Sequence, residues 1–173
     1  DWVNEGTVKM PQRINEWRRR YNLASKLPPE DLCFVPAAAT RIGDGSVLEK
    51  NISAPHQEHI KIPCRKYTWS VQVYFGSDLS PHHRYRLKLL LKADKKQDAG
   101  RAFSAGIYSH DKKICPLRRD GDAAEVSSDG FAWFDCGEFG GAEASAAMIY
   151  VAPDEDSAIT YLYVAAFKLE LVK

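Results

Sequence analysis

The stretch "RYRLKLLLKAD", residues 84–94, alternates apolar and charged side chains. The apolar positions are Tyr85, Leu87, Leu89 and Leu91, and the charged ones are Arg86, Lys88 and Lys92. A period of two is typical of a β-strand that buries one face and exposes the other to water. Antiparallel sheets commonly have one buried and one solvated face, so this stretch predicts an antiparallel strand.

The same alternation recurs along most of the chain. It is clear in "TWSVQVYF" (68–75), in "GRAFSAGIYS" (100–109) and at the end of "ITYLYVAAFKLELVK" (159–173). Shorter apolar runs are "LCFVPA" (32–37), "EHIKIPC" (58–64), "GFAWFDCGEF" (130–139) and "AAMIYVAP" (146–153). No helical pattern stands between these strands to serve as a crossover, which argues against a parallel α/β fold. We predict an all-β, antiparallel two-sheet sandwich of jelly-roll type; a barrel is the alternative that periodicity leaves open.

The N-terminal part differs from the rest. "PQRINEWRRRYNLAS" (11–25) places Ile14, Trp17 and Tyr21 on one stripe of a helix, and the Pro28-Pro29 pair ends the segment. This divides the chain into a short helical linker or packing segment (1–30) and a β-sandwich domain (31–173). The chain starts with Asp1 rather than methionine, and we expect a processed protein or a piece of a larger one.

Composition excludes several classes of partner. The formal net charge is only +1, so no strong field attracts nucleic acid. No apolar run is long enough to cross a membrane, and no signal peptide is visible. The four cysteines, at 33, 64, 115 and 136, form no CxxC pair. Their spacing leaves the disulfide state open.

Motifs for catalysis or metal binding are weak. No nucleophile elbow, phosphate loop or zinc-binding helix is present. "HQEH" (56–59) lacks the HExxH spacing, and "DGDAAE" (120–125) lacks the glycine and terminal glutamate of an EF-hand. "APDEDS" (152–157) reads as a solvated acidic loop. We therefore expect no catalytic residue, no metal ligand and no cofactor.

The order of the later segments resembles a known group of proteins. "YRLKLLLKAD", "GRAFSAGIYS", "GFAWFDCGEF" and the closing "FKLEL" are similar to the strands of galactose-binding-like β-sandwiches. These occur as carbohydrate-binding modules of bacterial glycoside hydrolases and polysaccharide lyases. The chain looks most similar to the C-terminal sandwich known as domain of unknown function 4838. Many members have an aspartate near the last strand that helps to hold a structural calcium. Ala165 and Ala166 precede Phe167 here, which disfavours that calcium.

Side chains on the wet faces suggest where a sugar would bind. Pyranose rings stack on aromatic side chains, and polar groups around the ring bind the hydroxyls. The residues out of phase with the aliphatics of their strands are Tyr74, Tyr108, His110, Gln72 and Lys88, with Arg86 beside Lys88. If their strands pair, these residues form one polar, aromatic face, with Gly106 leaving room for a ring. Trp133 lies on a strand that is apolar on both faces, and we predict that it belongs to the core.

These observations lead to one expectation and one rival. The expectation is a non-catalytic carbohydrate-binding module of a multidomain bacterial polysaccharide-degrading protein. Its partners would be an oligo- or polysaccharide and the catalytic domain of the parent chain, with no nucleic acid and no membrane. The resemblance implies a secreted, periplasmic or cell-surface location. The rival is a structural module that packs between domains and binds no sugar.

Overall fold

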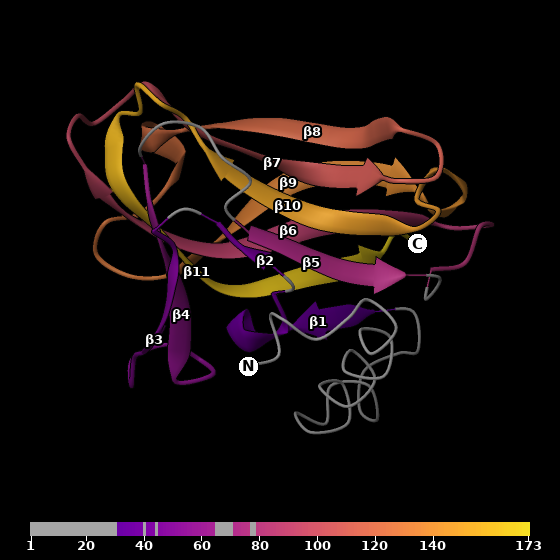
Figure 1. Cartoon of the computed structure of the whole chain (residues 1–173), viewed down its shortest axis with the longest axis horizontal. Coiled ribbons are helices and arrows are strands. Elements are labelled where there is room, and N and C mark those ends of the chain that lie inside the picture. The colour runs from indigo at the N-terminus through magenta and orange to yellow at the C-terminus, as the bar shows by residue number, and fades with distance from the viewer. Residues whose placement is uncertain (1–30, 40, 44, 65–70, 77–78) are drawn as a thin grey trace.

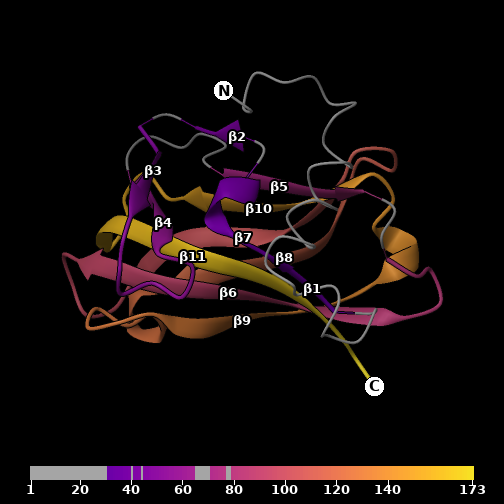
Figure 2. The ribbon, with the colours of Figure 1, turned by 90° about the horizontal axis from the view of Figure 1, so that it is seen from below.

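Two antiparallel β-sheets stacked face to face form the domain (Figure 1). The computed structural model describes residues 31–173 except 40, 44, 65–70 and 77–78. Figure 2 shows the layers after a quarter turn, with β5 and β10 in one and β11, β6 and β9 in the other. The fold class is thus confirmed. The predicted N-terminal helix (11–25) and residues 68–70 of the predicted strand 68–75 lie outside the described residues.

Sheet A has six strands in the order β3-β4-β11-β6-β9, with β1 also pairing with β11. Their bounds are β1 (Leu32–Phe34), β3 (Val47–Lys50), β4 (Glu58–Pro63), β6 (Arg84–Lys95), β9 (Ala132–Gly140) and β11 (Ile159–Leu171). Sheet B has five strands in the order β2-β5-β10-β7-β8. Their bounds are β2 (Arg41–Ile42), β5 (Val71–Gly76), β7 (Arg101–Ser109), β8 (Ile114–Asp122) and β10 (Ala147–Pro153). In the described part of the chain, three single-turn 3₁₀ helices connect strands: η3 (Pro36–Ala38), η4 (Ala123–Glu125) and η5 (Gly141–Glu143).

The core lies between the two sheets. Leu87, Leu89 and Leu169 of sheet A and Ile107 of sheet B are fully buried in it, as the alternation predicts. Leu87 and Leu89 are cross-strand partners of Leu169 and Phe167, so apolar side chains form continuous rows across sheet A. These rows fix the register, because a shift of one residue would turn every apolar side chain to water.

Two aromatic residues in or next to β9 lie outside the main core. Trp133 is 49% exposed, so the prediction that it belongs to the core is wrong. Phe134 and Cys136 are inward residues of this strand. Trp133 precedes Phe134 and is in phase with Asp135, so it points away from the core. Phe131 is half-buried and packs on a second, small apolar cluster outside the main core, formed by Ala54, Leu90, Ala165 and Ala166.

All four cysteines are free thiols. Cys64 and Cys136 are buried and Cys115 is exposed. Burial raises the pKa of Cys64 to about 11 and also raises the pKa of Cys136, so both thiols stay protonated and unreactive at neutral pH. Within the described part of the chain, no helix is long and apolar enough to cross a membrane.

Candidate functional site

The outer face of sheet B carries three of the predicted site residues. Tyr74 of β5 and Tyr108 of β7 both pair with Met148 of the intervening strand β10. Directly paired residues point to the same side of a sheet, so Tyr74 and Tyr108 lie in one row. Gln72 pairs with Tyr150 in the neighbouring row. The structure therefore brings Tyr74, Tyr108 and Gln72 onto one face.

His110 extends this face beyond the end of β7. The His110 ring is exposed and meets the Tyr108 ring edge-on, with ring centroids 5.1 Å apart. The His110 amide donates to the Ala146 carbonyl at 3.2 Å, which ties the turn after β7 to the start of β10. The His110 ring thus packs against one side of the Tyr108 ring.

Lys88 and Arg86 do not belong to this face, and their predicted place beside Tyr108 is wrong. Both lie on β6, which is a strand of sheet A. Lys88 Nζ lies 3.0 Å from a carboxylate oxygen of Glu170, and Arg86 pairs with Asp135 and Glu138. Alternation assigns a side chain to a face of its own strand, but it does not say which strands share a sheet.

A pocket of about 360 Å³ opens on the outer face of sheet B, over β7, β8 and β10. Its lining consists of Arg101, Ser104, Tyr108, Cys115, Arg118, Tyr150, Ala152 and Asp154. The volume falls within the range of small-ligand sites. Tyr108 is the only predicted site residue in the lining, so Tyr74, Gln72 and His110 lie beside the pocket rather than in it.

Tyr150 lies at the centre of the sheet and forms part of the pocket wall. It is 6% exposed, and its hydroxyl lies 3.4 Å from Cys115 Sγ. Burial is the main cause that raises the pKa of Tyr150, and the hydrogen bond with Cys115 raises it further. The phenol therefore stays protonated at any physiological pH and keeps its O–H for hydrogen bonding.

The remaining wall is charged: Arg101, Arg118 and Asp154 line it, and Asp120, outside the lining, pairs with both arginines. Arg101 pairs with Asp154 and lies 3.6 Å from a carboxylate oxygen of Asp120. Arg118 Nε lies 3.4 Å from the same oxygen, and the Asp120 charge raises the pKa of Arg118. Two guanidinium groups and two carboxylates thus form a network whose donors and acceptors border the aromatic side chains.

Gly106 has a different role from the predicted one. A Cβ at this position would lie 1.9 Å from the Leu117 carbonyl oxygen and 2.9 Å from the Tyr150 hydroxyl. The space above Gly106 is therefore filled by the backbone of β8 and by Tyr150, and no ring fits there. Glycine is needed because β7 and β8 approach each other closely.

Sequence reasoning missed most of the pocket because it missed β8. "ICPLRRDGD" (114–122) carries charges at consecutive positions and shows no alternation. Its "DGDAAE" portion ends the strand and starts η4, where Asp122 accepts a hydrogen bond from the Ala124 amide as an N-cap. Tyr150 was missed because β10 is apolar on both faces. One feature of the sequence could have indicated this wall of the pocket. It is the charged run "RRD" (118–120), which pairs with β7, the strand that carries Tyr108 on its polar side.

Solved structures with the same architecture are carbohydrate-binding modules and enzymes that carry similar sandwiches. The CBM22-1 xylan-binding domain of Paenibacillus barcinonensis Xyn10C matches 82% of this chain and 94% of its own length, at a TM-score of 0.56 and 12% identity. The C-terminal family 22 module of Clostridium thermocellum Xyn10B matches 82% of this chain and 85% of its own, at 0.52 and 11%. A Podospora anserina GH26-CBM35 β-(1,4)-mannanase matches 84% of this chain at 0.52 and 8%, and this chain spans only 28% of it.

No family model matches the chain, and no curated protein matches it by sequence. Identities near a tenth establish the fold alone. The chain thus shares the sandwich architecture of carbohydrate-binding modules. The predicted membership in domain of unknown function 4838 stays a prediction.

We expect no requirement for a metal ion. No group of three or more histidine, cysteine or acidic side chains with metal-binding geometry occurs among the residues that the structure describes. His59, from the "HQEH" sequence, has hydrogen-bond contacts with Asn51 and Glu49 at its two ring nitrogens. Excess EDTA should therefore leave the melting temperature within about 2 °C of the untreated protein, since no bound ion adds stability by mass action. A fall of many degrees, reversed by added calcium, would contradict this expectation.

Proposed function

We propose that this chain is a non-catalytic carbohydrate-binding module and that the pocket on the outer face of sheet B binds an oligo- or polysaccharide. The observation that carries the proposal is that Tyr108 and Tyr150 line one pocket together with two arginines that are each paired with an aspartate. Neutral sugars need an aromatic surface for their C–H faces and a border of donors and acceptors for their hydroxyls. The pocket offers both kinds of group.

A binding role fits this pocket better than a catalytic one. Glycosidases use a pair of carboxyl groups that act on the scissile bond. Asp120 and Asp154 are both close to Arg101, which holds them as acceptors of hydrogen bonds. Arginine is a good partner for this purpose because it stays charged and directs its donors in a fixed plane.

The architecture of the matched structures supports a modular context. We infer that the parent is a multidomain bacterial protein that degrades polysaccharides, that a catalytic domain adjoins this chain, and that the protein is secreted or displayed at the cell surface. A shallow pocket on a sheet buries little ligand surface. We therefore expect binding free energies of about 4–7 kcal/mol, or dissociation constants from the millimolar to the ten-micromolar range.

Tyr108→Ala should abolish measurable binding at this pocket. The ring is half-buried on the outer face, so its removal takes away the aromatic surface and leaves the core intact. A glycan array with the intact chain would identify the ligand, and calorimetry would measure the loss. Tyr161→Ala is the matched control, because Tyr161 is a half-exposed tyrosine of sheet A that does not line the pocket. It should bind like the unmodified protein.

Two results would count against the proposal. Unchanged affinity in Tyr108→Ala, with a normal melting temperature, would move the site away from sheet B. Binding to none of the plant, algal or host glycans at millimolar concentration would favour the rival role as an interdomain packing module.

A further inference from the structure

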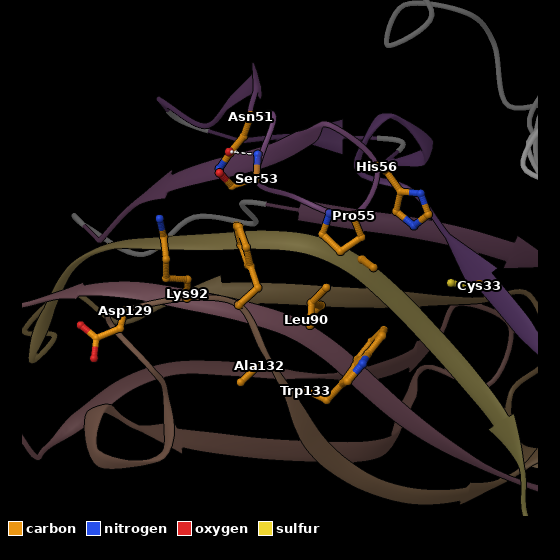
Figure 3. A pocket seen from close by; sticks show the side chains of 13 residues that line it. Cys33, Asn51, Ser53, Pro55, His56, Leu90, Lys92, Asp129, Ala132 and Trp133 are labelled. Atoms are coloured by element: carbon orange, nitrogen blue, oxygen red, sulfur yellow. Dashed lines mark hydrogen bonds between the residues drawn. The ribbon is translucent and has the colours of Figure 1, made fainter.

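A second and larger groove lies on the opposite side of the molecule. It runs over the outer face of sheet A and has a volume of about 730 Å³. Figure 3 shows Leu90 and Trp133 on the sheet, with Pro55 and His56 contributed by the loop between β3 and β4. Among the residues that the structure describes, none lines both this groove and the sheet B pocket. The two cavities are therefore independent.

The floor of this groove is apolar. Trp133 of β9 pairs with Leu90 of β6, and Leu90 pairs with Ala166 of β11, so the three side chains form one row. Leu90 and Ala166 are almost fully buried, whereas Trp133 is 49% exposed. The Trp133 indole thus stands at the edge of an apolar surface, and about half of this tryptophan is exposed to solvent. Because this indole lines a cavity, it offers a ligand an apolar ring face and an N–H donor, the two kinds of group that ligand sites combine.

The wall opposite the tryptophan is a rigid loop. Ala54, at its middle, is buried against the sheet in the cluster with Leu90 and Ala166. The backbone N–H of Asn51 donates to the Gln57 carbonyl at 2.8 Å, and the backbone N–H of Gln57 donates to the Ala54 carbonyl at 2.9 Å. The loop is thus anchored at its centre and closed at its base. Preformed walls lower the ordering cost of binding a weak ligand.

A buried histidine fixes the base of the same loop. Asn51 Nδ2 donates to His59 Nδ1 at 3.0 Å, which leaves the Nε2–H of His59 to donate to Glu49 at 2.8 Å. The ring also meets Tyr163 edge-on, with centroids 5.0 Å apart. Lys92 Nζ lies 4.9 Å from the Tyr163 ring centroid and 5.3 Å from that of Phe131. Loop, sheet and aromatic side chains are thus connected by specific contacts.

The border of the groove is polar but nearly neutral. Asn51 and Ser53 lie on the loop side, and within the described lining the charged residues are one lysine, Lys92, and one aspartate, Asp129. Burial lowers the pKa of His56, which keeps this ring uncharged at neutral pH. An anionic lipid headgroup or an acidic peptide would need a cluster of cations. The lining supplies only Lys92; Lys168, whose Nζ lies 5.9 Å from the Trp133 ring centroid, is paired with Glu170 at 2.8 Å.

We propose that this groove is a second carbohydrate site, in which the Trp133 indole stacks on a neutral pyranose of a glycan. The proposal rests on the proposed function, since it assigns the same class of ligand to a different surface. The groove supplies an exposed indole and an apolar floor. The amide of Asn51, the hydroxyl of Ser53 and the imidazole of His56 line its border, where they can bind the hydroxyls of a sugar. Two sites on opposite faces would let one module contact two chains of a polysaccharide, which raises avidity without a new fold.

The test uses the intact chain labelled with 5-fluorotryptophan and followed by fluorine NMR. Four tryptophans give four signals, and the variant Trp133→Phe assigns the one of interest. The probes are xylohexaose, mannohexaose and panose as neutral glycans and tetragalacturonate as an acidic one, each up to about 10 mM. We expect the Trp133 signal to shift with at least one neutral probe, and to shift equally in Tyr108→Ala. Trp133→Ala should weaken binding at this groove about tenfold or more.

Matched variants separate the two sites. Ile52→Ala changes a 90% exposed residue of the same loop that does not line the groove, and it should leave the Trp133 shift unchanged. Calorimetric stoichiometry with a shared ligand should fall from two to one in Trp133→Ala and in Tyr108→Ala, and to zero in the double variant. Melting temperatures of the variants check that each remains folded.

Each outcome decides between the sites. A Trp133 shift without any effect of Tyr108→Ala on binding would support the groove and overturn the sheet B site. A Trp133 signal unmoved by every probe, while Tyr108-dependent binding is measured, would overturn the groove alone. A shift with tetragalacturonate only would overturn the assignment to a neutral glycan. If no probe gives a heat of binding and none shifts the Trp133 signal, both sites are overturned.

Discussion

Gly106→Ala is expected to destabilise the domain by about 3 kcal/mol or more. The added methyl group would lie 1.9 Å from the Leu117 carbonyl oxygen and 2.8 Å from its carbonyl carbon. These are backbone atoms of the neighbouring strand, so no side chain can rotate away to make space. The clash is relieved only if β8 moves away from β7, which breaks hydrogen bonds of the ladder. Domains of this kind have unfolding free energies of about 5–15 kcal/mol, so this change removes a large share of the stability.

Urea unfolding followed by circular dichroism measures this effect, and Gly130→Ala is the control. A Cβ at Gly130 has no atom within 4 Å, and this glycine has an ordinary φ. The control should change the unfolding free energy by less than about 0.5 kcal/mol. If Gly106→Ala costs less than about 1 kcal/mol, then β8 does not approach β7 as closely as the structure shows.

Leu89→Ala is expected to cost about 2–5 kcal/mol of the free energy of unfolding. Leu89 is fully buried at the centre of β6 and pairs with Phe167 on one side and Phe134 on the other. Its removal leaves a cavity between two aromatic residues that are themselves held in rows, and the surroundings can collapse only in part. The same range applies to Leu87, Ile107 and Leu169, which are equally buried.

Ile52→Ala serves as the control for this series, because it also truncates an aliphatic side chain but at a position that is 90% exposed. Its effect should stay within about 0.5 kcal/mol. Thermal and urea unfolding should rank the variants in the same order. Losses below about 1 kcal/mol at most of the buried positions would mean that the faces of the strands are assigned the wrong way round.

The sequence predicts the fold well where one face of a strand is buried and the other is wet. Leu87 and Leu89 show this, because alternation alone places both in the core. It fails for β8, because an arginine takes the place of an aliphatic residue at the margin of the sandwich. Arg119 places its guanidinium 5.1 Å from the Phe134 ring centroid and pairs with Glu125. A long cationic side chain covers apolar surface there with its stem, and no hydropathy pattern distinguishes this from a loop.

The candidate site shows the same division between local and long-range information. Parity correctly places Tyr74 and Tyr108 on one face, since each is out of phase with its own aliphatic residues. The alternation along a strand does not show that β6 lies in the other sheet, so the prediction wrongly groups Lys88 with Tyr74 and Tyr108. Nor does it tell that a backbone carbonyl occupies the space above Gly106. Strand pairing decides both points, and it depends on contacts between residues far apart in the sequence.

The position of β8 as the last strand of sheet B has a consequence for solubility. An outer strand leaves backbone donors and acceptors unpaired on one side, where a second molecule can add its own strand and start aggregation. β8 carries Pro116, which has no N–H, and the charged run Arg118, Arg119 and Asp120, both of which oppose such pairing. Of these charged residues, Arg118 lines the proposed sugar pocket, and Asp120 pairs with it. Variants that neutralise Arg118 or Asp120 to test binding will therefore also weaken this protection, and their oligomeric state must be measured before a loss of binding is attributed to the pocket.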